Sequence, residues 1–515
     1  MKDPLVLAFD MGTQSVRSLL IDPVGTILFK AQKDYAEPYY SKRPGGAEQK
    51  AQFYWESLAE TSRTLKEKAG VLWDDIIAVT CATIRDTCVC LDKNNEPVRD
   101  AIVWVDDRTV NDLPPLPAAF QAFLKLSMLE DKVDLQRRKS HCNWIAVYEK
   151  EVWEKTRTFA MISTWLNFKF TGNLLDSNAS MRGHLPFDNK RRTWMKQSDL
   201  RRIIFVVKDD RLFDLVDPGT VLGTITPQAA EETGIKAGLP LIATGSDKGC
   251  ETLGLSCLSE EKAALSFGTT ATVQVSTRHY FDPIPNMPAY AAVVPGYFNP
   301  EAQIYRGYWL LSWFKREFAA KENAQAEKIG VSTEKLLDDR LKEIRPGCDG
   351  LIFQPYFTPV FTMPHAKGAV IGFSDSHTRM HLYRAIIEGL NFALMQGLET
   401  LQKRGKLTTK KIFVAGGGAR SDEVCQITAS QFGIPVYRTQ THEACGIGEA
   451  LCAFVSKGIF SSYEEGLQHM VHVKDEFLPD KNDHAVYREL YERIFVKVFS
   501  KLSPLYQEIN EIIRR

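Results

Sequence analysis

A short polar turn near the start of the chain carries residue types that could hold a phosphate or a metal ion. Residues 6–9 and 16–21 read as buried strands, so residues 10–15 must form the turn between them. Asp10 could face a divalent cation or its waters, and backbone N–H groups of the turn could bind phosphate oxygens. The side chains that would join them are Thr13, Gln14, Ser15 and Arg17. The alternative is a plain hairpin with a solvated aspartate.

A Walker-type phosphate loop is excluded here, because that loop contains a lysine and leads into a helix, whereas this turn leads into a strand. The same pattern returns at residues 264–276, "ALSFGTTATVQVS", as strand, Gly-Thr turn and strand. Two such hairpins, each opening what looks like its own domain, predict a duplicated architecture with a ligand held between the halves.

Asp247 stands where a strand over residues 239–244 gives way to a helix, between Gly245 and Gly249. We expect the two glycines to let a ligand approach the backbone. A carboxylate at this place can accept the proton of an attacking hydroxyl during phosphoryl transfer. The alternative role is a helix cap, which is common for aspartate, and the two roles are compatible.

Three glycines, Gly416 to Gly418, lie between a predicted strand at 411–415 and a helix at 421–432. Their spacing is not G-x-G-x-x-G, and the next strand ends at Arg438 where a ribose-binding carboxylate would be required. Hydride transfer is therefore disfavoured. A glycine turn against the adenosine of a mononucleotide fits better.

Arginine and aspartate side chains follow two strands, as Arg85–Asp86 and as Asp106 in the run Asp106–Arg108. Alternating guanidinium and carboxylate groups supply the donors and acceptors that a polyhydroxyl ligand needs. Structural ion pairs are the alternative.

Composition bounds the class of protein. A chain of 515 residues predicts two domains, and 44% hydrophobic with 25% charged residues is typical of a globular protein. With 64 basic and 64 acidic residues the formal net charge is zero, so neither nucleic acid nor a membrane is the expected partner. The ten cysteines are scattered and no signal peptide is recognised, which indicates reduced thiols and a cytoplasmic protein.

Taken together, these motifs resemble the FGGY family of carbohydrate kinases, in the superfamily of actin, Hsp70 and sugar kinases. The resemblance covers nearly the whole chain. It rests on "FDMGTQSVR" at 9–17, "GGAEQ" at 45–49, "AIVWVDDRT" at 101–109, "GSDKG" at 245–249, "SFGTT" at 266–270, "GFSDSHTRMHLYRAIIEGLNFAL" at 372–394 and "AGGGARSD" at 415–422.

The resemblance implies an α/β fold of two actin-like, ribonuclease H-like domains, each with a mixed sheet flanked by helices, around a central cleft. Residues 1–245 would bind the sugar and residues 246–515 would bind ATP. It also implies Mg²⁺, a small-molecule sugar or polyol as substrate, and no nucleic acid or membrane partner; we allow for a homodimer.

The resemblance also assigns roles to individual residues. Asp247 would be the general base, and Asp10 together with Asp247 would act on Mg²⁺. The implied ATP contacts are Thr13, Gln14, Ser15 and Arg17 in the first hairpin, Gly268 and Thr269 in the second, and Gly417, Gly418 and Ser421 at the adenosine. The implied sugar contacts are Arg85, Asp86, Asp106, Asp247 and Lys248.

The identity of the sugar stays open. Arg85–Asp86 looks like a shortened version of the Arg-Glu pair of glycerol kinases, but Lys248 stands where those enzymes have glutamine. Additional cations could accommodate a larger polyol, a ketose or a sugar acid. Two other classes remain as alternatives: an actin-like or Hsp70-like ATPase, and a catalytically silent sugar-binding protein on the same scaffold.

Overall fold

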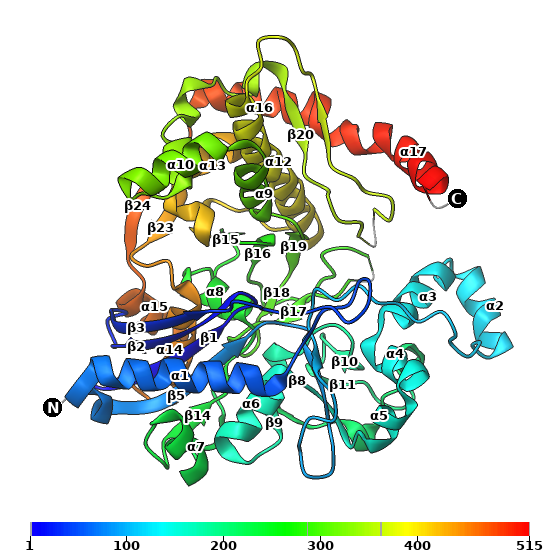
Figure 1. Cartoon of the computed structure of the whole chain (residues 1–515), viewed down its shortest axis with the longest axis vertical. Coiled ribbons are helices and arrows are strands. Elements are labelled where there is room, and N and C mark those ends of the chain that lie inside the picture. The colour runs from blue at the N-terminus through cyan, green and yellow to red at the C-terminus, as the bar shows by residue number, and fades with distance from the viewer. Residues whose placement is uncertain (1–2, 286, 361–362, 514–515) are drawn as a thin grey trace. The chain divides into compact units, whose positions relative to one another are not determined.

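The computed structural model describes residues 3–285, 287–360 and 363–513 (Figure 1). The chain divides into two compact units, each built from separate stretches of sequence. Unit 1 comprises Met1–Gly254, Tyr290–Phe298 and Cys445–Val471; unit 2 comprises Leu255–Ala289, Asn299–Ala444 and His472–Arg515. The domain boundary that we expect between residues 245 and 246 stays a prediction.

Unit 1 is organised around a six-stranded mixed sheet in the order β13-β14-β5-β1-β2-β3. Strands β1, β2 and β3 run antiparallel, β1, β5 and β14 run parallel, and β13 closes the edge antiparallel to β14. The bounds are β1 Leu5–Met11, β2 Ser15–Ile21, β3 Ile27–Asp34, β5 Ile76–Thr83, β13 Val221–Thr224 and β14 Pro240–Ile242.

Unit 2 repeats this arrangement in a sheet of order β19-β16-β15-β22-β23-β24. Its bounds are β15 Lys262–Phe267, β16 Ala271–Val275, β19 Glu301–Ile304, β22 Lys411–Ala415, β23 Val436–Thr439 and β24 Val473–Phe477. The strand directions match those of unit 1 one by one: antiparallel on one side of β15, then parallel to β22 and β23, and antiparallel again at β24. The predicted duplication is therefore confirmed.

Helices pack on the two six-stranded sheets. The remaining short strands pair into smaller sheets. In unit 1, α1 lies along β2 and β3 (Figure 1). The helices of unit 1 are α1 Ala51–Ala69, α2 Ala118–Leu126, α3 Glu130–Lys139, α4 His141–Tyr148, α5 Lys150–Lys155, α6 Ile162–Thr171, α7 Pro227–Thr233, α8 Asp247–Gly254, α14 Ala444–Ser456 (from Cys445 on) and α15 Tyr463–Met470. Those of unit 2 are α9 Trp309–Phe318, α10 Ala320–Ile329, α11 Thr333–Asp338, α12 Arg379–Gly405, α13 Asp422–Phe432, α16 Lys481–Leu490 and α17 Val496–Ile513. The remaining strands are β4 Glu48–Gln49, β6 Cys88–Leu91, β7 Ala101–Ile102, β8 Thr158–Met161, β9 Leu175–Ser177, β10 Phe187–Asp188, β11 Thr193–Trp194, β12 Asp214–Val216, β17 Tyr290–Ala291, β18 Phe298–Asn299, β20 Ile352–Gln354 and β21 Ala369–Ile371.

Strand β7 is short because the chain turns after Ile102, so that Asp106 N–H donates to the carbonyl of Val103. The C-terminal helical region begins at Lys481, where the Asp480 side chain caps α16. A single π-helical turn at Tyr491–Phe495 separates α16 from α17.

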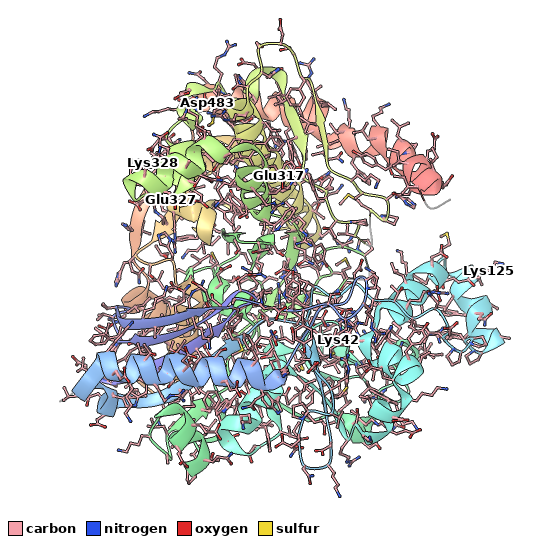
Figure 2. The ribbon with its side chains drawn as sticks, in the orientation of Figure 1. Lys42, Lys125, Glu317, Glu327, Lys328 and Asp483 are labelled. Carbon is pink, nitrogen blue, oxygen red and sulfur yellow. The ribbon has the colours of Figure 1, made fainter. Side chains whose placement is uncertain are left out.

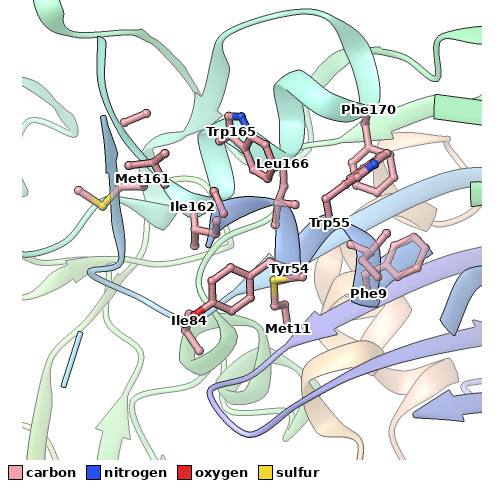
Figure 3. Close-up of a cluster of buried hydrophobic side chains, with 14 of the residues drawn as sticks. Phe9, Met11, Tyr54, Trp55, Ile84, Met161, Ile162, Trp165, Leu166 and Phe170 are labelled. Atoms are coloured by element: carbon pink, nitrogen blue, oxygen red, sulfur yellow. The ribbon is translucent and has the colours of Figure 1, made fainter. Parts of the chain in front are cut away.

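The core of unit 1 lies between the main sheet and helices α1 and α6 (Figure 3). The Trp55 ring from α1 meets Phe170 of α6 edge-on at 4.9 Å between ring centroids, and Phe170 in turn contacts Phe9 of β1 at 5.8 Å. Apolar positions of α1 recur at helical spacing, which places this aromatic ring on the sheet side. The core therefore holds β1, and with it the first polar turn.

Charged side chains of both signs cover the surface. Figure 2 shows Lys125, Glu327 and Lys328 extending outward from their helices, and all three are exposed. Throughout the described ranges, none of the helices combines the length and the apolar character needed to cross a membrane.

We predict that Trp55→Ala destabilises the protein by about 3–5 kcal/mol, because Trp55 is 1% exposed and its removal leaves a cavity against Phe170. The measurement is the free energy of unfolding in urea. The control is Val71→Ala, where the side chain is 80% exposed and we expect a change of about 0.5 kcal/mol or less. Equal unfolding midpoints for the two variants would contradict this description of the core.

Candidate active site

Asp247 is the first residue of α8, but it does not cap the helix. The cap is Ser246, whose hydroxyl accepts the Gly249 N–H at 3.2 Å and whose carbonyl accepts the Cys250 N–H at 2.9 Å. The Asp247 carboxylate accepts the N–H of the next residue, Lys248, at 2.8 Å. Because another side chain serves as the cap, the Asp247 carboxylate is left for other chemistry.

The two glycines near Asp247 are explained by packing within the protein, and not by the approach of a ligand that we expected from the sequence. A Cβ on Gly245 would lie 2.9 Å from the Val293 side chain, and one on Gly249 would lie 3.2 Å from it. These positions are glycine because the segment 290–298 packs closely against the start of α8. Close approach of a ligand is not what requires them.

The environment of Asp247 favours a proton acceptor. Burial raises the pKa of Asp247 above the ordinary value for aspartate, while the nearby Arg85 and Lys248 cations oppose that rise. The Arg85 Nε lies 4.0 Å from the Asp247 Oδ1, and the carboxylate side chain is still 25% exposed. A carboxylate with a raised pKa binds a proton more strongly than an ordinary aspartate, which suits a general base.

Asp86 is held by a histidine that the sequence patterns did not single out. The Asp86 carboxylate lies 3.1 Å from the Nδ1 of His184, and the His184 ring contacts the buried His141 ring at 4.4 Å between centroids. Burial alone would raise the pKa of Asp86, but His184, His141 and Arg182 together outweigh burial and the pKa is lowered. Gly183 must be glycine, because a Cβ there would fall 2.2 Å from the Asp86 carboxylate.

Two arginines share one aromatic ring beside these groups. The guanidinium carbons of Arg182 and Arg85 lie 4.3 Å and 5.4 Å from the ring centre of Tyr290. Lys248 completes the cationic set, with its Nζ 3.1 Å from Glu251 Oε1. We call Arg85, Asp86, Arg182, His184, Asp247, Lys248 and Tyr290 the acceptor cluster; all seven belong to unit 1.

Asp106 does not join the acceptor cluster through any contact of its carboxylate. Both of its oxygens accept hydrogen bonds from Arg108, at 2.7 Å each, and one also accepts the Ala47 N–H at 2.6 Å. The Arg108 guanidinium also binds Glu48 at 2.8 Å. Asp106 is thus engaged in a buried structural ion pair, which is the alternative that the sequence left open.

The first polar turn is held in place by two hydrogen bonds. Gly12 N–H donates to the Ser15 carbonyl at 2.9 Å and closes the turn, and Trp104 Nε1 donates to the Thr13 hydroxyl at 2.8 Å. Gln14 is exposed at the tip, whereas Ser15 is buried at the start of β2. The turn is therefore fixed by its own backbone and by a neighbouring indole.

Asp10 and Arg17 face each other across this hairpin. They are paired in the β1–β2 register, and the guanidinium donates to the carboxylate at 2.8 Å. The negative charge of Asp10 also contributes to the raised pKa of Asp247, so the two carboxylates are close enough to interact. Within the described ranges, three or more histidine, cysteine, aspartate or glutamate side chains do not gather as metal ligands anywhere.

In unit 2 the second Gly-Thr turn lies against the glycine-rich turn. Gly416, at φ +88°, has no room for a Cβ, which would lie 3.1 Å from the Gly268 nitrogen. A Cβ on Gly418 would strike the Tyr308 ring at 2.2 Å, whereas Gly417 faces open space. The Tyr308 N–H also donates to the Gly268 carbonyl, at 3.0 Å. The second Gly-Thr turn and the glycine-rich turn are therefore packed directly against each other.

The residues flanking the glycine-rich turn hold its shape. Ser421 caps α13 by accepting the Val424 N–H at 3.3 Å. Arg438 donates to the carbonyls of Ala419 at 3.0 Å and Arg420 at 3.2 Å. Arg438 therefore holds the end of the glycine-rich turn in place. It also stands at the position where a dinucleotide-binding fold would have a ribose-binding carboxylate.

Glu449, which sequence reasoning missed, lies buried beneath the first turn. Its carboxyl accepts the Ala82 N–H at 2.8 Å, and Ala82 is the neighbour of Asp10 in the parallel register of β1 and β5. Burial, together with the nearby Asp10 carboxylate, raises the pKa of Glu449 well above its ordinary value. The signal available in the sequence is an acidic residue within the small-residue helix "ACGIGEALCAF".

Comparison with known proteins decides the family. Residues 5–254 match the N-terminal domain of the FGGY family of carbohydrate kinases, and residues 263–457 match the C-terminal domain. The chain belongs to the FGGY family of carbohydrate kinases. It is an ATP-dependent carbohydrate kinase with a small-molecule sugar substrate.

The relatives match over nearly the whole chain. "Uncharacterized sugar kinase YgcE" of Escherichia coli strain K12 is 26% identical over 520 residues, 100% of this chain and 97% of the relative. The xylulose kinase of Lactococcus lactis is 24% identical over 514 residues, covering 98% of each. The ligand-bound xylulose kinase structure from Lactobacillus acidophilus has a TM-score of 0.83 at 19% identity, covering 98% of this chain and 100% of that one. The predicted fold class of this FGGY kinase is thereby confirmed.

We predict that His184 stabilises the FGGY kinase in a pH-dependent way. Burial would lower the pKa of His184, but the Asp86 carboxylate raises it above its ordinary value. The stabilisation is therefore fully present below the unfolded pKa of about 6.5 and is lost as the pH rises through the raised pKa. His184→Gln should lower the melting temperature by roughly 2–4 °C more at pH 6 than at pH 9, for a contribution of about 1 kcal/mol.

The control for this prediction is Val71→Ala, at an exposed position of unit 1. This substitution changes no titratable group, so its melting temperature relative to the unmodified protein should be the same at both pH values. A His184→Gln loss that is equal at pH 6 and pH 9 would show that no protonated histidine pairs with Asp86.

Proposed function

We propose that Asp247 is the general base of this kinase and that the acceptor hydroxyl binds in the acceptor cluster. The observation that carries the proposal is that Ser246, and not Asp247, caps α8. The Asp247 carboxylate is therefore left beside Arg85, and its pKa is raised. A residue needed only for the helix end would make the capping bond itself.

The acceptor is a small sugar or polyol held by hydrogen bonds from charged groups of fixed direction. Arg85 supplies donors next to the base, and Asp86, held by His184, supplies an acceptor. Lys248 adds a further donor at the first turn of α8. Asp106 has no part in this proposal, because its oxygens are engaged by Arg108 and Ala47.

ATP is assigned to the two Gly-Thr turns and the glycine-rich turn. Backbone N–H groups in turns of this kind can hold phosphate oxygens. The residues assigned to ATP are Thr13, Gln14, Ser15 and Arg17 in unit 1 and Gly268, Thr269, Gly417, Gly418 and Ser421 in unit 2. The open space at Gly417, where a side chain would meet nothing within 4 Å, supports a ligand against this backbone.

Asp10 and Asp247 fit a Mg²⁺ ion that accompanies ATP. Mg²⁺ is usually held by one or two carboxylates, with waters and substrate phosphates as the other ligands, and these two carboxylates interact electrostatically. When bound, the ion would neutralise charge on the phosphates. Arg17, bonded to Asp10, keeps this carboxylate oriented.

The transfer needs little covalent chemistry from the protein. The acceptor oxygen attacks the terminal phosphorus of ATP, the bond from that phosphorus to the bridging oxygen breaks, and ADP leaves. The hydroxyl proton passes to the Asp247 carboxylate, whose raised pKa favours accepting it. The remaining residues align the two reactants and exclude water, which would otherwise compete as the nucleophile.

We predict that Asp247→Asn lowers kcat by roughly 10²–10⁴-fold, because an amide cannot accept the hydroxyl proton. The dissociation constant of ATP measured without Mg²⁺ should stay within a few-fold, which also serves as the control that the variant is folded. The measurements are a coupled ADP-release assay and a nucleotide titration. Near-normal turnover in this variant would remove Asp247 from the role of base.

We predict that Arg85→Gln raises the acceptor KM at least tenfold and leaves the ATP KM within about twofold. Its guanidinium lies beside the base and over the Tyr290 ring, both in the acceptor cluster. Steady-state kinetics with each substrate varied in turn makes the comparison. Equal changes in the two KM values would contradict the assignment of Arg85 to the acceptor.

A further inference from the structure

In unit 2, a short segment after strand β19 is fixed against the second Gly-Thr turn. Residues 305–308 run from the end of β19 to the start of α9. The Thr270 hydroxyl donates to the Tyr305 carbonyl at 3.2 Å, and the Tyr308 N–H donates to the Gly268 carbonyl at 3.0 Å. The two ends of the segment are therefore bonded to residues on either side of the tip of the turn.

Arg306 lies inside this segment, beside the exposed tip of the turn at Thr269. The register of β16 and β19, in which Ala271 faces Ile304, continues into the turn and brings Arg306 opposite Thr269. The next residue, Gly307, must be glycine, because a Cβ there would lie 2.2 Å from the Ala271 nitrogen. The backbone of Arg306 therefore has little freedom to move away from the turn.

The Arg306 side chain rests on an aromatic ring. Its guanidinium carbon lies 5.0 Å from the ring centre of Trp309, the first residue of α9, and both residues are half-buried. Throughout the part of the chain that the structure describes, the guanidinium forms no ion pair and no hydrogen bond besides this ring contact. A guanidinium stacked on a ring keeps its N–H donors, which lie in its own plane, for a ligand at its edge.

A second arginine of unit 2 shows what a structural role looks like. Arg438, next to the glycine-rich turn, donates to the carboxylates of Asp422 and Asp475 at 2.6 Å each. The charge of Arg438 is thus neutralised within the protein. Arg306 is also fixed at a turn assigned to ATP, but the described residues do not neutralise its charge.

A cation without a counter-ion at a half-buried position favours an anionic ligand. Partial burial weakens the screening of its charge by water, so an anion there interacts more strongly than at an open surface. The neighbouring turn is assigned to the phosphates of ATP, and it packs against the glycine-rich turn assigned to the adenosine. A guanidinium matches phosphate oxygens with two parallel N–H donors. The ligand chemistry that fits is therefore the phosphate chain of the nucleotide.

We propose that Arg306 binds the phosphate chain of ATP and ADP at the second Gly-Thr turn, with its guanidinium oriented by Trp309. This inference rests on the proposed function, because it requires the phosphates to lie at this turn. Arg306 then adds a charged donor to the backbone N–H groups of the turn. Its removal weakens the binding of nucleotides that carry a phosphate chain and leaves the binding of adenosine unchanged.

The test is isothermal titration of the full chain with adenosine, ADP and a non-hydrolysable ATP analogue, each in the presence of Mg²⁺. Arg306→Gln should raise the dissociation constants of ADP and of the ATP analogue roughly tenfold or more, because a charged hydrogen bond is lost. The dissociation constant of adenosine should stay within about twofold. Equal losses with adenosine and ADP would indicate a change in the fold and would overturn the inference.

The chain offers a matched control in the same unit. Lys411 is an exposed cation over the Tyr437 ring, 5.4 Å from its centre, at the end of β22 opposite the glycine-rich turn. Lys411→Gln removes the same charge and an equivalent cation–ring contact, and should leave all three dissociation constants unchanged. If Lys411→Gln weakens ADP as much as Arg306→Gln does, the effect comes from overall charge and the inference is overturned.

A further variant separates this inference from the assignment of ATP itself. Gly417→Ala places a methyl group where nothing in the protein lies within 4 Å, so it should keep the fold and weaken all three ligands, adenosine included. If Gly417→Ala weakens all three and Arg306→Gln weakens none, the inference about Arg306 is overturned and the assignment of ATP stands. If neither variant has an effect, the assignment of ATP to these turns fails as well.

Discussion

The proposed site depends on keeping one carboxylate partly desolvated without neutralising its charge. Burial of Asp247 favours its protonated form, and the cations of Arg85 and Lys248 favour its ionised form. The balance gives an acid group that is a better proton acceptor than a solvated aspartate but still has charged partners. A stronger ion pair would lower its proton affinity, and deeper burial would keep it neutral. The hydrogen bonding of Ser246 at the helix end allows this balance, because the carboxylate is released from capping.

The two turns assigned to phosphate are also held in shape by contacts from neighbouring residues. Each turn joins two adjacent antiparallel strands of a mixed sheet, and each accepts a hydrogen bond from an aromatic residue: Thr13 from the Trp104 indole, and Gly268 from the Tyr308 backbone. In unit 2, glycine is required at Gly416 by close backbone contacts and at Gly418 by the Tyr308 ring, which leaves Gly417 as the open position. Rigid backbone donors suit phosphate binding, since they need no reorganisation when the ligand arrives.

Much of the fold could be predicted because its signals are local. The Gly-Thr hairpins, the helix that follows Ser421 and the apolar spacing of α1 are each encoded within about twenty residues. The acceptor cluster was accessible only in part, because only Arg85, Asp86, Asp247 and Lys248 follow predicted strands. Arg182 and His184 come from an irregular segment and Tyr290 from the two-residue strand β17, and these three meet the others only through tertiary packing. For Asp106 the sequence could not decide between substrate and ion pair, because the choice depends on where Arg108 turns back.

The most direct measurement is a crystal structure of the kinase with a non-hydrolysable ATP analogue and an accepted substrate. The account predicts an acceptor hydroxyl within hydrogen-bond distance of the Asp247 carboxylate. A bound acceptor whose hydroxyl groups all point away from Asp247 would contradict it.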